Sequence, residues 1–335
     1  MRVGGPASFF CEINSEEDLQ EAVSFAKKKN LPVFILGGGS NIIVRDEGFN
    51  GVVIHMNLKG VSFGHPKNKV VRVEVSAGEN WDDFVKQTVE RNLHGLENLS
   101  FIPGLVGAAP VQNIGAYGFE VGGTIREVLV FDITTAVIRS FKNKECSFSY
   151  RNSIFKQNPH LIILKVVFEL IEGGETNIHY KDLAEYFKNS KKPPTIRAVR
   201  DAVVLIRKAK LADPRDIGTV GSFFKNPILT KERYAKLCEK YPDLPGYTVY
   251  KVRSGVSRQV SGVKIPLAWV LDRICGLKGL RKGNVGLYKT QPLVLVNYGG
   301  ATAEEIEMFA RDIQKKVFDM THITPEYEIS FVGKS

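Results

Sequence analysis

One hydroxyl stands among glycines, aromatic rings and a cation in the stretch 218–227, which reads Gly-Thr-Val-Gly-Ser-Phe-Phe-Lys-Asn-Pro. A serine is a weak acid, so Ser222 can donate a proton usefully only to a developing carbanion in a site that excludes water. The glycines let the backbone approach a ligand, and the two aromatic rings can keep solvent out. Lys225 and Asn226 supply donors for an anionic oxygen or an amide. The alternative is a strand that ends in a turn, with both rings in the core.

A glycine-rich segment, Gly37-Gly-Gly-Ser-Asn41, follows the apolar run 33–36. Three glycines after a strand can expose consecutive backbone N–H groups to a pyrophosphate, and the serine and asparagine side chains add donors. The spacing is not the G-x-G-x-x-G of a Rossmann fold, and no helical pattern follows. The segment predicts a phosphate-binding loop, with a tight turn as the alternative.

A second glycine-rich run extends from Ile102 to Gly118 without a charged residue, although it contains Gln112, Asn113 and Tyr117. Buried amides need hydrogen-bond partners, and a ring with alternating carbonyls and nitrogens would supply them. This composition predicts a backbone wrapped around a large planar ligand, with a packed glycine-rich helix and loop as the alternative.

The composition indicates a globular protein of two or three domains, because 335 residues exceed what one hydrophobic core usually organises. The net charge of +10 indicates acidic partners, but the basic residues are dispersed and form no nucleic-acid-binding motif. We therefore expect small, multiply anionic ligands and no nucleic acid. The four cysteines are far apart and the six histidines are not clustered, which predicts reduced thiols and no metal site.

The apolar segments predict a cytoplasmic protein that does not contact the membrane. The first residues, Met-Arg-Val-Gly-Gly-Pro, lack the hydrophobic region of a signal peptide. The longest apolar runs, such as 162–170, have the length of a strand and are interrupted by Lys165. We also expect the protein to act as a monomer.

Hydrophobic periodicity and capping residues predict helices and strands along the whole chain. Helices are expected at 16–29, 81–91, 196–209 and 303–317, the last with a capping box of Thr302 and Glu305. Strands are expected at 33–36, 42–44, 52–54, 71–75, 127–133, 136–138, 160–170 and 323–332. The polar stretch 58–68 is expected to be a boundary between two parts.

Five motifs make the chain resemble the UDP-N-acetylenolpyruvoylglucosamine reductases, flavoenzymes that make UDP-N-acetylmuramic acid for peptidoglycan. The resemblance runs from Arg2 to Gly333, and the combination of motifs is highly specific. The motifs are L-G-G-G-S-N at 36–41, I-P-G-L-V-G at 102–107, N-I-G-A-Y-G at 113–118, Y-R-N-S-I-F at 150–155 and G-S-F-F-K-N-P at 221–227.

The resemblance implies an α+β fold in three parts. These are the two subdomains of an FAD-binding domain of the vanillyl-alcohol-oxidase (PCMH) type and a C-terminal α+β substrate-binding domain. The first subdomain is expected at 1–65, joined by the C-terminal strand region 320–335. The second subdomain is expected at 66–212, and the substrate-binding domain at 213–319.

The resemblance also implies the cofactor, the reductant and their contacts. NADPH is expected to donate hydride to FAD, and the FAD is expected to be noncovalent because the L-G-G-G-S-N loop has no histidine. The implied FAD contacts are Gly37, Gly38, Gly39, Ser40, Asn41, Pro103, Gly104, Gly107, Asn113 and Gly115.

The implied substrate is a UDP-sugar enolpyruvyl ether, which takes a hydride at its terminal carbon and a proton at the carbon that bears the carboxylate. Ser222 matches the proton donor, and Arg151 and Glu328 match the pair that polarises the carboxylate. Tyr180 matches the tyrosine that closes over the substrate in the type I subfamily. The other implied substrate contacts are Tyr117, Lys210, Asn226 and Gln291.

The C-terminal motif departs from the family pattern, because Ile-Ser follows Glu328 where Val-Arg is usual. Glu326 is therefore an alternative to Glu328 for the catalytic carboxylate. We favour Glu328, since the following Phe331-Val-Gly333 fixes the register.

Two other functions remain open at this point. The first is an FAD oxidase or dehydrogenase on the same scaffold, against which Ser222, Tyr180 and Gln291 argue. The second, from a different class, is a single-strand nucleic-acid-binding module that uses stacking aromatics. An ultraviolet-visible spectrum of the purified protein separates the flavoenzymes from the nucleic-acid binder, which would be colourless.

Overall fold

The computed structural model describes residues 1–253 and 257–333. It divides into two compact units, neither of which is continuous in sequence. The large unit contains Ala7–Ser40 and Phe49–Ala209. The small unit contains Met1–Pro6, Asn41–Gly48 and the chain from Lys210 onward.

The large unit begins with a three-stranded parallel sheet in the order β1-β4-β2. The helix α1 (Glu16–Lys28) starts at a capping box of Ser15 and Asp18 and buries Leu19, Val23 and Ala26. The strands are β1 (Ala7–Ile13), β2 (Val33–Leu36) and β4 (Phe49–Met56).

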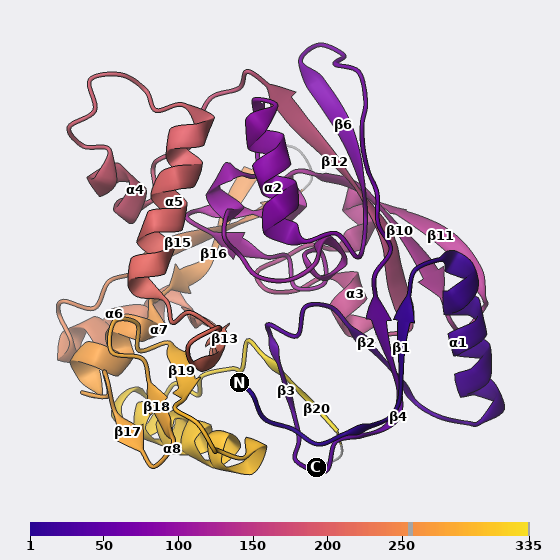
Figure 1. Ribbon diagram of the computed structural model, residues 1–335. Helices are drawn as coiled ribbons and strands as arrows, with labels where there is room; N and C mark the ends of the chain where they lie inside the picture. Colours follow the sequence, from indigo (N-terminus) through magenta and orange to yellow (C-terminus); the bar gives the residue numbers. More distant parts are fainter. Residues whose placement is uncertain (254–256, 334–335) are drawn as a thin grey trace. The chain divides into compact units, whose positions relative to one another are not determined.

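A six-stranded sheet forms the rest of the large unit's core, and its long strands lie side by side in Figure 1. It contains β11 (Val137–Lys142), β10 (Ile125–Asp132), β12 (Leu161–Glu172), β6 (Val70–Ser76) and β5 (Val61–Phe63) in that order, with β7 (Leu93–His94) paired to β12. Alternate residues of β6 are buried, as expected for a sheet with one face in the core. The helix α2 (Trp81–Glu90) packs through Trp81 and Phe84 onto Phe168 of β12, with ring centroids 5.1–6.2 Å apart.

The turn between β10 and β11 is held by Asp132, whose Oδ1 accepts hydrogen bonds from the hydroxyl and the N–H of Thr134. These bonds, the hydroxyl first, lower the pKa of Asp132 from 3.8 to about 2. A lowered folded-state pKa stabilises the fold at neutral pH, and that contribution is lost as the pH falls from about 4 toward 2.

Asp132→Asn is therefore expected to melt about 2–4 °C below the parent protein at neutral pH, for a loss of about 1 kcal/mol. The difference should shrink as both proteins are melted at decreasing pH below 4, where the parent carboxyl becomes protonated. A difference that stays constant down to the acid limit would contradict this role of the carboxylate.

Several short strands and helices, followed by the 15-residue helix α5, complete the large unit. They are β8 (Gly115–Ala116), β9 (Phe119–Glu120), α3 (Ile154–Gln157), α4 (Lys181–Tyr186) and α5 (Ile196–Lys210). The helix α5 buries Ile196, Val199, Ala202 and Val203, and the chain passes to the small unit where this helix ends.

In the part that the structure describes, the small unit contains a four-stranded and a three-stranded sheet and three α-helices, the second of which is continued by the π-helical turn Val270–Ile274. The first sheet has the order β13 (Gly218–Ser222), β19 (Val294–Asn297), β18 (Val285–Leu287) and β17 (Arg281–Lys282). The second has the order β14 (Ile228–Leu229), β16 (Ser257–Lys264) and β15 (Tyr247–Arg253). The helices are α6 (Lys231–Lys240), α7 (Leu267–Trp269) and α8 (Ala303–Thr321).

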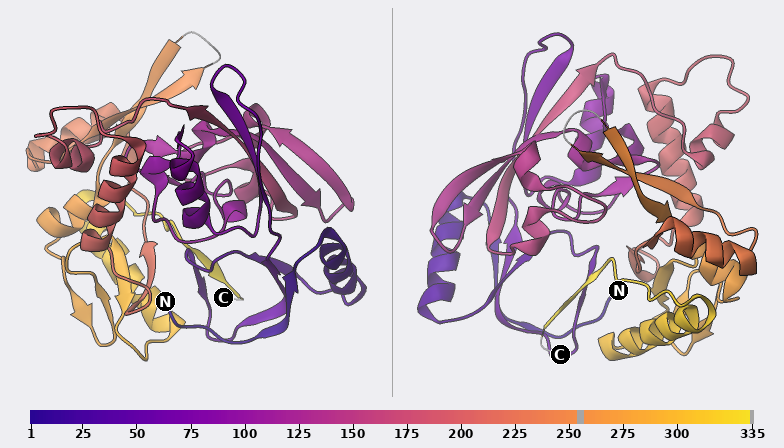
Figure 2. Two further views of the ribbon diagram at one scale, coloured as in Figure 1. Left: turned by 45° about the horizontal axis from the view of Figure 1, so that its top comes forward. Right: turned by 180° about the vertical axis from the view of Figure 1, so that it is seen from behind.

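The last strand of the chain pairs with a strand from its beginning. Figure 2 shows the yellow β20 (Ser330–Val332) beside the indigo β3 (Ile42–Val44), to which it is parallel. Asp46, after β3, accepts hydrogen bonds from the N–H groups of Ala303 and Glu304 at the start of α8. This N-terminal segment is thus built into the small unit by both a strand pair and a helix cap.

Three expectations need correction. The expected strand 323–332 is only 330–332, because β3 pairs with these three residues alone and Tyr327 before them makes only an isolated bridge with Phe224. The polar stretch 58–68 contains β5, which pairs with β6 inside the large unit. Phe223 and Phe224 are fully buried in the core of the small unit, so they belong to the interior and do not form the solvent-excluding wall of a site.

Among the described residues, no helix has the length and hydropathy needed to cross a membrane.

Candidate functional site

Two glycine loops of the large unit lie against each other, Gly37–Ser40 after β2 and Pro103–Gly107 after α2. A Cβ atom on Gly38 would lie only 2.8 Å from the Cα of Gly104, so the backbones meet where no side chain fits. The Ser40 hydroxyl donates a hydrogen bond of 3.2 Å to the Pro103 carbonyl. Gly38 and Gly39 are exposed, so this paired backbone is accessible to a ligand.

The second loop is fixed from behind by the segment before α2. The N–H groups of Val106 and Gly107 donate to the carbonyls of Glu79 and Ala77, both at 2.9 Å. A Cβ atom on Gly107 would lie 2.6 Å from that of Ala77. Gly107 therefore allows close packing against Ala77. The contact between the loops Gly37–Ser40 and Pro103–Gly107 at Gly38 and Gly104 is called the cradle below.

Four non-glycine residues with positive φ lie in the glycine-rich run 102–118 or next to it. Phe101, Asn113, Tyr117 and Arg151 all have positive φ, at 59°, 47°, 49° and 53°. A non-glycine residue in this region costs roughly 1–3 kcal/mol, and such residues cluster at active sites and ligand clamps. The strain marks this part of the large unit as a candidate site.

Asn113 shapes the loop through bonds within the protein. It is buried, and its amide donates to Glu120 at 2.9 Å and to the Ser149 carbonyl at 3.1 Å. Its amide oxygen accepts from the N–H of Gly122 at 2.8 Å. The expectation that a ligand ring supplies the partners of this amide is therefore wrong, because protein groups supply them.

Arg151 reaches the same glycine-rich run from the segment before α3. Its guanidinium donates to the Gly115 carbonyl at 2.9 Å and lies 5.2 Å from the ring centroid of its neighbour Tyr150. The predicted substrate residue and the predicted cofactor residue are thus neighbours in the large unit.

Tyr117 and Tyr180 also meet, with ring centroids 5.3 Å apart in an edge-on contact. Burial raises the pKa of Tyr117 to about 12, although nearby Arg207 acts in the opposite direction. Tyr180, at the start of α4, is 45% exposed. Tyr180 is thus a largely exposed ring that contacts the partly buried ring of Tyr117, whereas a core tyrosine would be mostly buried.

In the small unit, Ser222 ends β13 next to Gly221, which has a φ of +73°. The following Phe223 accepts a hydrogen bond of 2.9 Å from the N–H of Glu328. Asn41 donates through its side chain to the Glu328 carbonyl at 3.2 Å. Ser222, Asn41 and Glu328 are thus brought close together from three distant parts of the sequence.

The two candidate carboxylates differ clearly. Glu328 is buried, with 8% of its surface exposed. The Glu326 side chain is 75% exposed and forms an ion pair with Lys225 at 2.9 Å. A surface ion pair is an ordinary solvated arrangement. A buried glutamate such as Glu328 is unusual, because charged side chains are rarely buried.

The remaining predicted substrate residues lie at two places in the small unit. The Lys210 carbonyl accepts from the hydroxyl of Thr290, the residue before Gln291, at 2.8 Å. Asn226 uses its side-chain oxygen to accept from the N–H of Leu267 at the start of α7, also at 2.8 Å. These bonds position the segments that carry the expected diphosphate, sugar and uridine contacts.

Sequence reasoning missed the buried polar residue Asn98. Its amide donates to the carbonyls of Tyr117 at 3.2 Å and Asn177 at 2.9 Å, so it joins the glycine-rich run to the segment before Tyr180. The available signal was an asparagine within the run Leu96-Glu-Asn-Leu99, because a buried amide needs partners.

Comparison with known proteins gives a consistent result for both halves of the chain. Residues 7–131 match the model of an FAD binding domain, and residues 211–332 match that of the UDP-N-acetylenolpyruvoylglucosamine reductase C-terminal domain. A UDP-N-acetylenolpyruvoylglucosamine reductase of Flavobacterium johnsoniae is 41% identical over 97% of this chain and 94% of its own length. The reductase of Bdellovibrio bacteriovorus is 41% identical over 96% of this chain and 93% of its own.

The fold is also that of a solved structure. The UDP-N-acetylenolpyruvylglucosamine reductase of Thermus caldophilus has a TM-score of 0.68, with 24% identity over 99% of this chain and 94% of its own. The expected α+β fold, with an FAD-binding domain and a C-terminal domain, is confirmed.

FAD is the cofactor, and the matched FAD binding domain contains both glycine loops. The two loops pack backbone to backbone at Gly38 and Gly104, and Gly38 and Gly39 are exposed, which suits a group held by backbone N–H donors. On the sequence identity along nearly its full length and on both domain matches, this chain belongs to the UDP-N-acetylenolpyruvoylglucosamine reductase family of FAD-dependent oxidoreductases.

Proposed function

We propose that this protein reduces UDP-N-acetylglucosamine enolpyruvate to UDP-N-acetylmuramate with NADPH, a step of peptidoglycan precursor synthesis. The observation that supports the proposal is the backbone hydrogen bond from the N–H of Glu328 to the carbonyl of Phe223, which brings the segment that carries Ser222 next to the segment of a buried glutamate. Reduction of the enolpyruvyl group requires a proton donor, and it requires a polar group close to the carboxylate of the substrate.

Bound FAD would supply the hydride chemistry, between NADPH and the terminal carbon of the enolpyruvyl group. Ser222 donates the proton to the carbon that bears the carboxylate. Arg151 stabilises the negative charge that develops on the carboxylate oxygens during that transfer. Glu328 acts with Arg151 on this carboxylate, and its burial is the reason to prefer it to the solvated Glu326.

The cofactor contacts are proposed at the cradle. Backbone N–H groups of Gly37–Gly39 face the pyrophosphate, with Ser40, Asn41, Pro103 and Gly104 completing the contact and Gly115 near the ring. We propose that FAD is bound without a covalent bond, since the loop Gly37–Asn41 offers no histidine. Lys210, Asn226, Gln291 and Tyr117 are proposed to contact the diphosphate, sugar and uridine portions of the substrate.

Tyr180 is proposed to close over the bound diphosphate and to open again for NADPH. Tyr180→Phe is expected to raise KM for the enolpyruvyl substrate about tenfold, the value of a hydrogen bond to a charged group, and to relieve inhibition by excess substrate. The melting temperature should stay nearly unchanged, because the residue is 45% exposed.

The substrate-inhibition curve and the melting temperature are to be measured on one preparation. Tyr186→Phe, on the same helix and 50% exposed, is the control that should change neither. An unchanged inhibition curve with a lowered melting temperature would show that Tyr180 is a structural residue.

The test of the proposed function is turnover of the enolpyruvyl substrate with NADPH, followed by identification of the product. Formation of UDP-N-acetylmuramate supports the proposal. Flavin that NADPH reduces, but that only oxygen reoxidises, would instead indicate an oxidase on the same scaffold.

We further propose that the protein works as a cytoplasmic monomer on these small molecules. Light scattering at the concentration of the assay should give the mass of one chain, 37.3 kDa. A stable mass of twice this value would contradict the monomer.

A further inference from the structure

The backbone of Phe101 is held on both sides by charged side chains, two residues before the loop Pro103–Gly107. Its N–H donates to Oδ1 of Asp82 at 2.5 Å, and its carbonyl accepts from Nε of Arg207 at 3.0 Å. Phe101 has a φ of 59°, a conformation that a bulky side chain rarely adopts. Such a strained residue persists only where its surroundings hold it in place.

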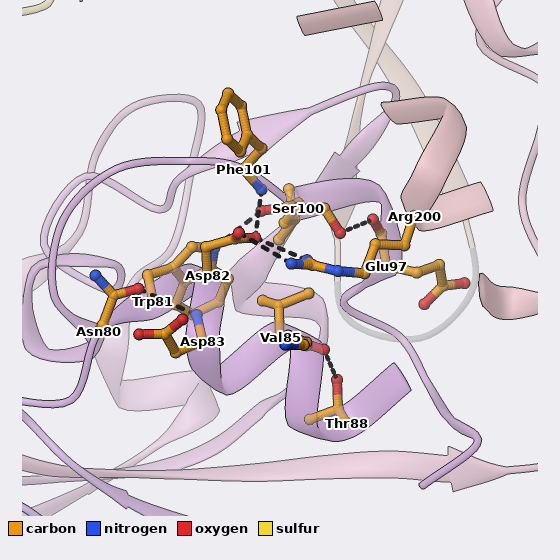
Figure 3. Close-up of polar contacts among 12 residues, drawn as sticks. Asn80, Trp81, Asp82, Asp83, Val85, Thr88, Glu97, Ser100, Phe101 and Arg200 are labelled. Carbon is orange, nitrogen blue, oxygen red and sulfur yellow. Dashed lines mark hydrogen bonds and ion pairs between the residues drawn. The ribbon is translucent and has the colours of Figure 1, made fainter. Parts of the chain in front are cut away.

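Asp82 is itself held by an ion pair with a residue 118 positions away. Both terminal guanidinium nitrogens of Arg200, on α5, donate to the carboxylate, at 2.7 Å to Oδ1 and 2.9 Å to Oδ2. Figure 3 shows the Asp82 carboxylate between the Arg200 guanidinium and the Phe101 N–H. A bidentate pair fixes direction as well as distance, and the Arg200 side chain is only 12% exposed.

The direction of the chain at Phe101 decides where the following residues go. Pro103 accepts the hydrogen bond from Ser40, and Gly104 lies opposite Gly38. Gly104 also accepts from the N–H of Trp81, the residue before Asp82. A return of Phe101 to an ordinary backbone conformation would redirect the chain and separate the two loops of the cradle.

We propose that Asp82, oriented by Arg200, is a positioning residue for FAD. It holds Phe101 in the left-handed conformation and thereby keeps the loop Pro103–Gly107 in the cradle. The inference rests on the proposed contact of the two glycine loops with FAD. It assigns Asp82 no contact with the cofactor or the substrate.

The experiment compares Asp82→Asn with Asp83→Asn, which removes the same charge from the same turn of α2. Asp83 is exposed, and Figure 3 shows it bonded through its backbone N–H to the Asn80 side chain. FAD is removed from each protein, and the apoprotein is titrated with FAD by flavin fluorescence. Asp82→Asn is expected to weaken FAD binding at least tenfold, with a change in the flavin absorption bands. Asp83→Asn should bind FAD as the parent protein does.

The variant Asp132→Asn distinguishes a specific effect on FAD binding from a general loss of stability. It removes another carboxylate of the same unit that accepts a hydrogen bond from a backbone N–H. This variant should melt at a lower temperature with unchanged FAD affinity. If Asp82→Asn binds FAD as tightly as the parent protein, or if Asp132→Asn weakens FAD binding as much, the proposal is overturned.

Rescue gives a stricter test, because asparagine adopts the left-handed conformation far more readily than phenylalanine. In a background of Phe101→Asn, the change Asp82→Asn should cost clearly less FAD affinity than in the parent protein. Equal losses in the two backgrounds would contradict a role through Phe101. If Asp82→Asn does not fold, Arg200→Met takes its place in both comparisons.

Failure of this inference is distinguishable from failure of the cofactor site. Gly38→Ala obstructs the cradle directly, whatever Asp82 does. If Gly38→Ala loses FAD affinity and Asp82→Asn keeps it, Asp82 is not a positioning residue, but the two glycine loops still bind FAD. Full affinity in both variants would reject the site as well.

Discussion

Ser222→Ala is expected to leave reduction of the flavin by NADPH intact and to slow its reoxidation by the enolpyruvyl substrate roughly 100- to 10,000-fold. Only the second half-reaction needs a proton, and positioned proton transfer contributes a factor of this size. The Ser222 side chain is only partly buried and ends its strand, so its loss should disturb the fold little. Stopped-flow traces should therefore show fast bleaching of the flavin and slow recovery.

The control for this prediction is Ser261→Ala, which removes the exposed hydroxyl that donates to the Val249 carbonyl elsewhere in the small unit. It should leave both half-reactions unchanged. If Ser222→Ala slows the two half-reactions equally, the hydroxyl has a structural role and the proton comes from another group.

Gly38→Ala is expected to yield a folded protein that loses most of its flavin during purification. The added Cβ would lie 2.8 Å from the Cα of Gly104, a distance that forces the two loops apart. Overpacking of this kind costs about 1–3 kcal/mol, which corresponds to a loss of FAD affinity of about tenfold to a hundredfold. Gly39→Val should also lose flavin, but through its φ of +64°, because a Cβ there meets only the end of Leu36, at 3.9 Å.

The matched change is Gly123→Ala in the same unit, where an added Cβ meets nothing within 4 Å. This variant should purify yellow, with the flavin content of the parent protein. Stoichiometric flavin in Gly38→Ala, measured by absorbance against protein concentration, would remove the loop Gly37–Ser40 from the cofactor site.

Elements with strong local signals could be predicted from the sequence. The helices α1 and α8 carry capping boxes at Ser15 and Thr302, and the alternation of β6 is unbroken, so local residues alone define them. The strand β5 was missed because its surroundings are rich in glycine, proline and lysine, and only its pairing with β6 makes it a strand. The C-terminal strand was predicted too long because its length also depends on a distant partner. The partner strand β3 pairs with only Ser330–Val332.

The chemistry of the site was less accessible to local reasoning. The motif around Ser222 indicates a proton donor, but its two phenylalanines proved to be core residues, and nothing near them in sequence points to Glu328. The glycine loops could be identified as ligand-binding segments, whereas their close approach at Gly38 and Gly104 depends on the fold. Asp82 and Arg200 carry no local motif, because their proposed role depends on the fold, which places the Asp82 carboxylate between the Arg200 guanidinium and the N–H of Phe101.

The most direct measurement is a single turnover without oxygen, in which NADPH-reduced protein is mixed with UDP-N-acetylglucosamine enolpyruvate. We predict that the blue absorption band of oxidised flavin returns at once, and that the product has the mass of the substrate plus two hydrogens. A band that stays bleached until oxygen is admitted, with the enolpyruvyl substrate recovered unchanged, would contradict the proposed function.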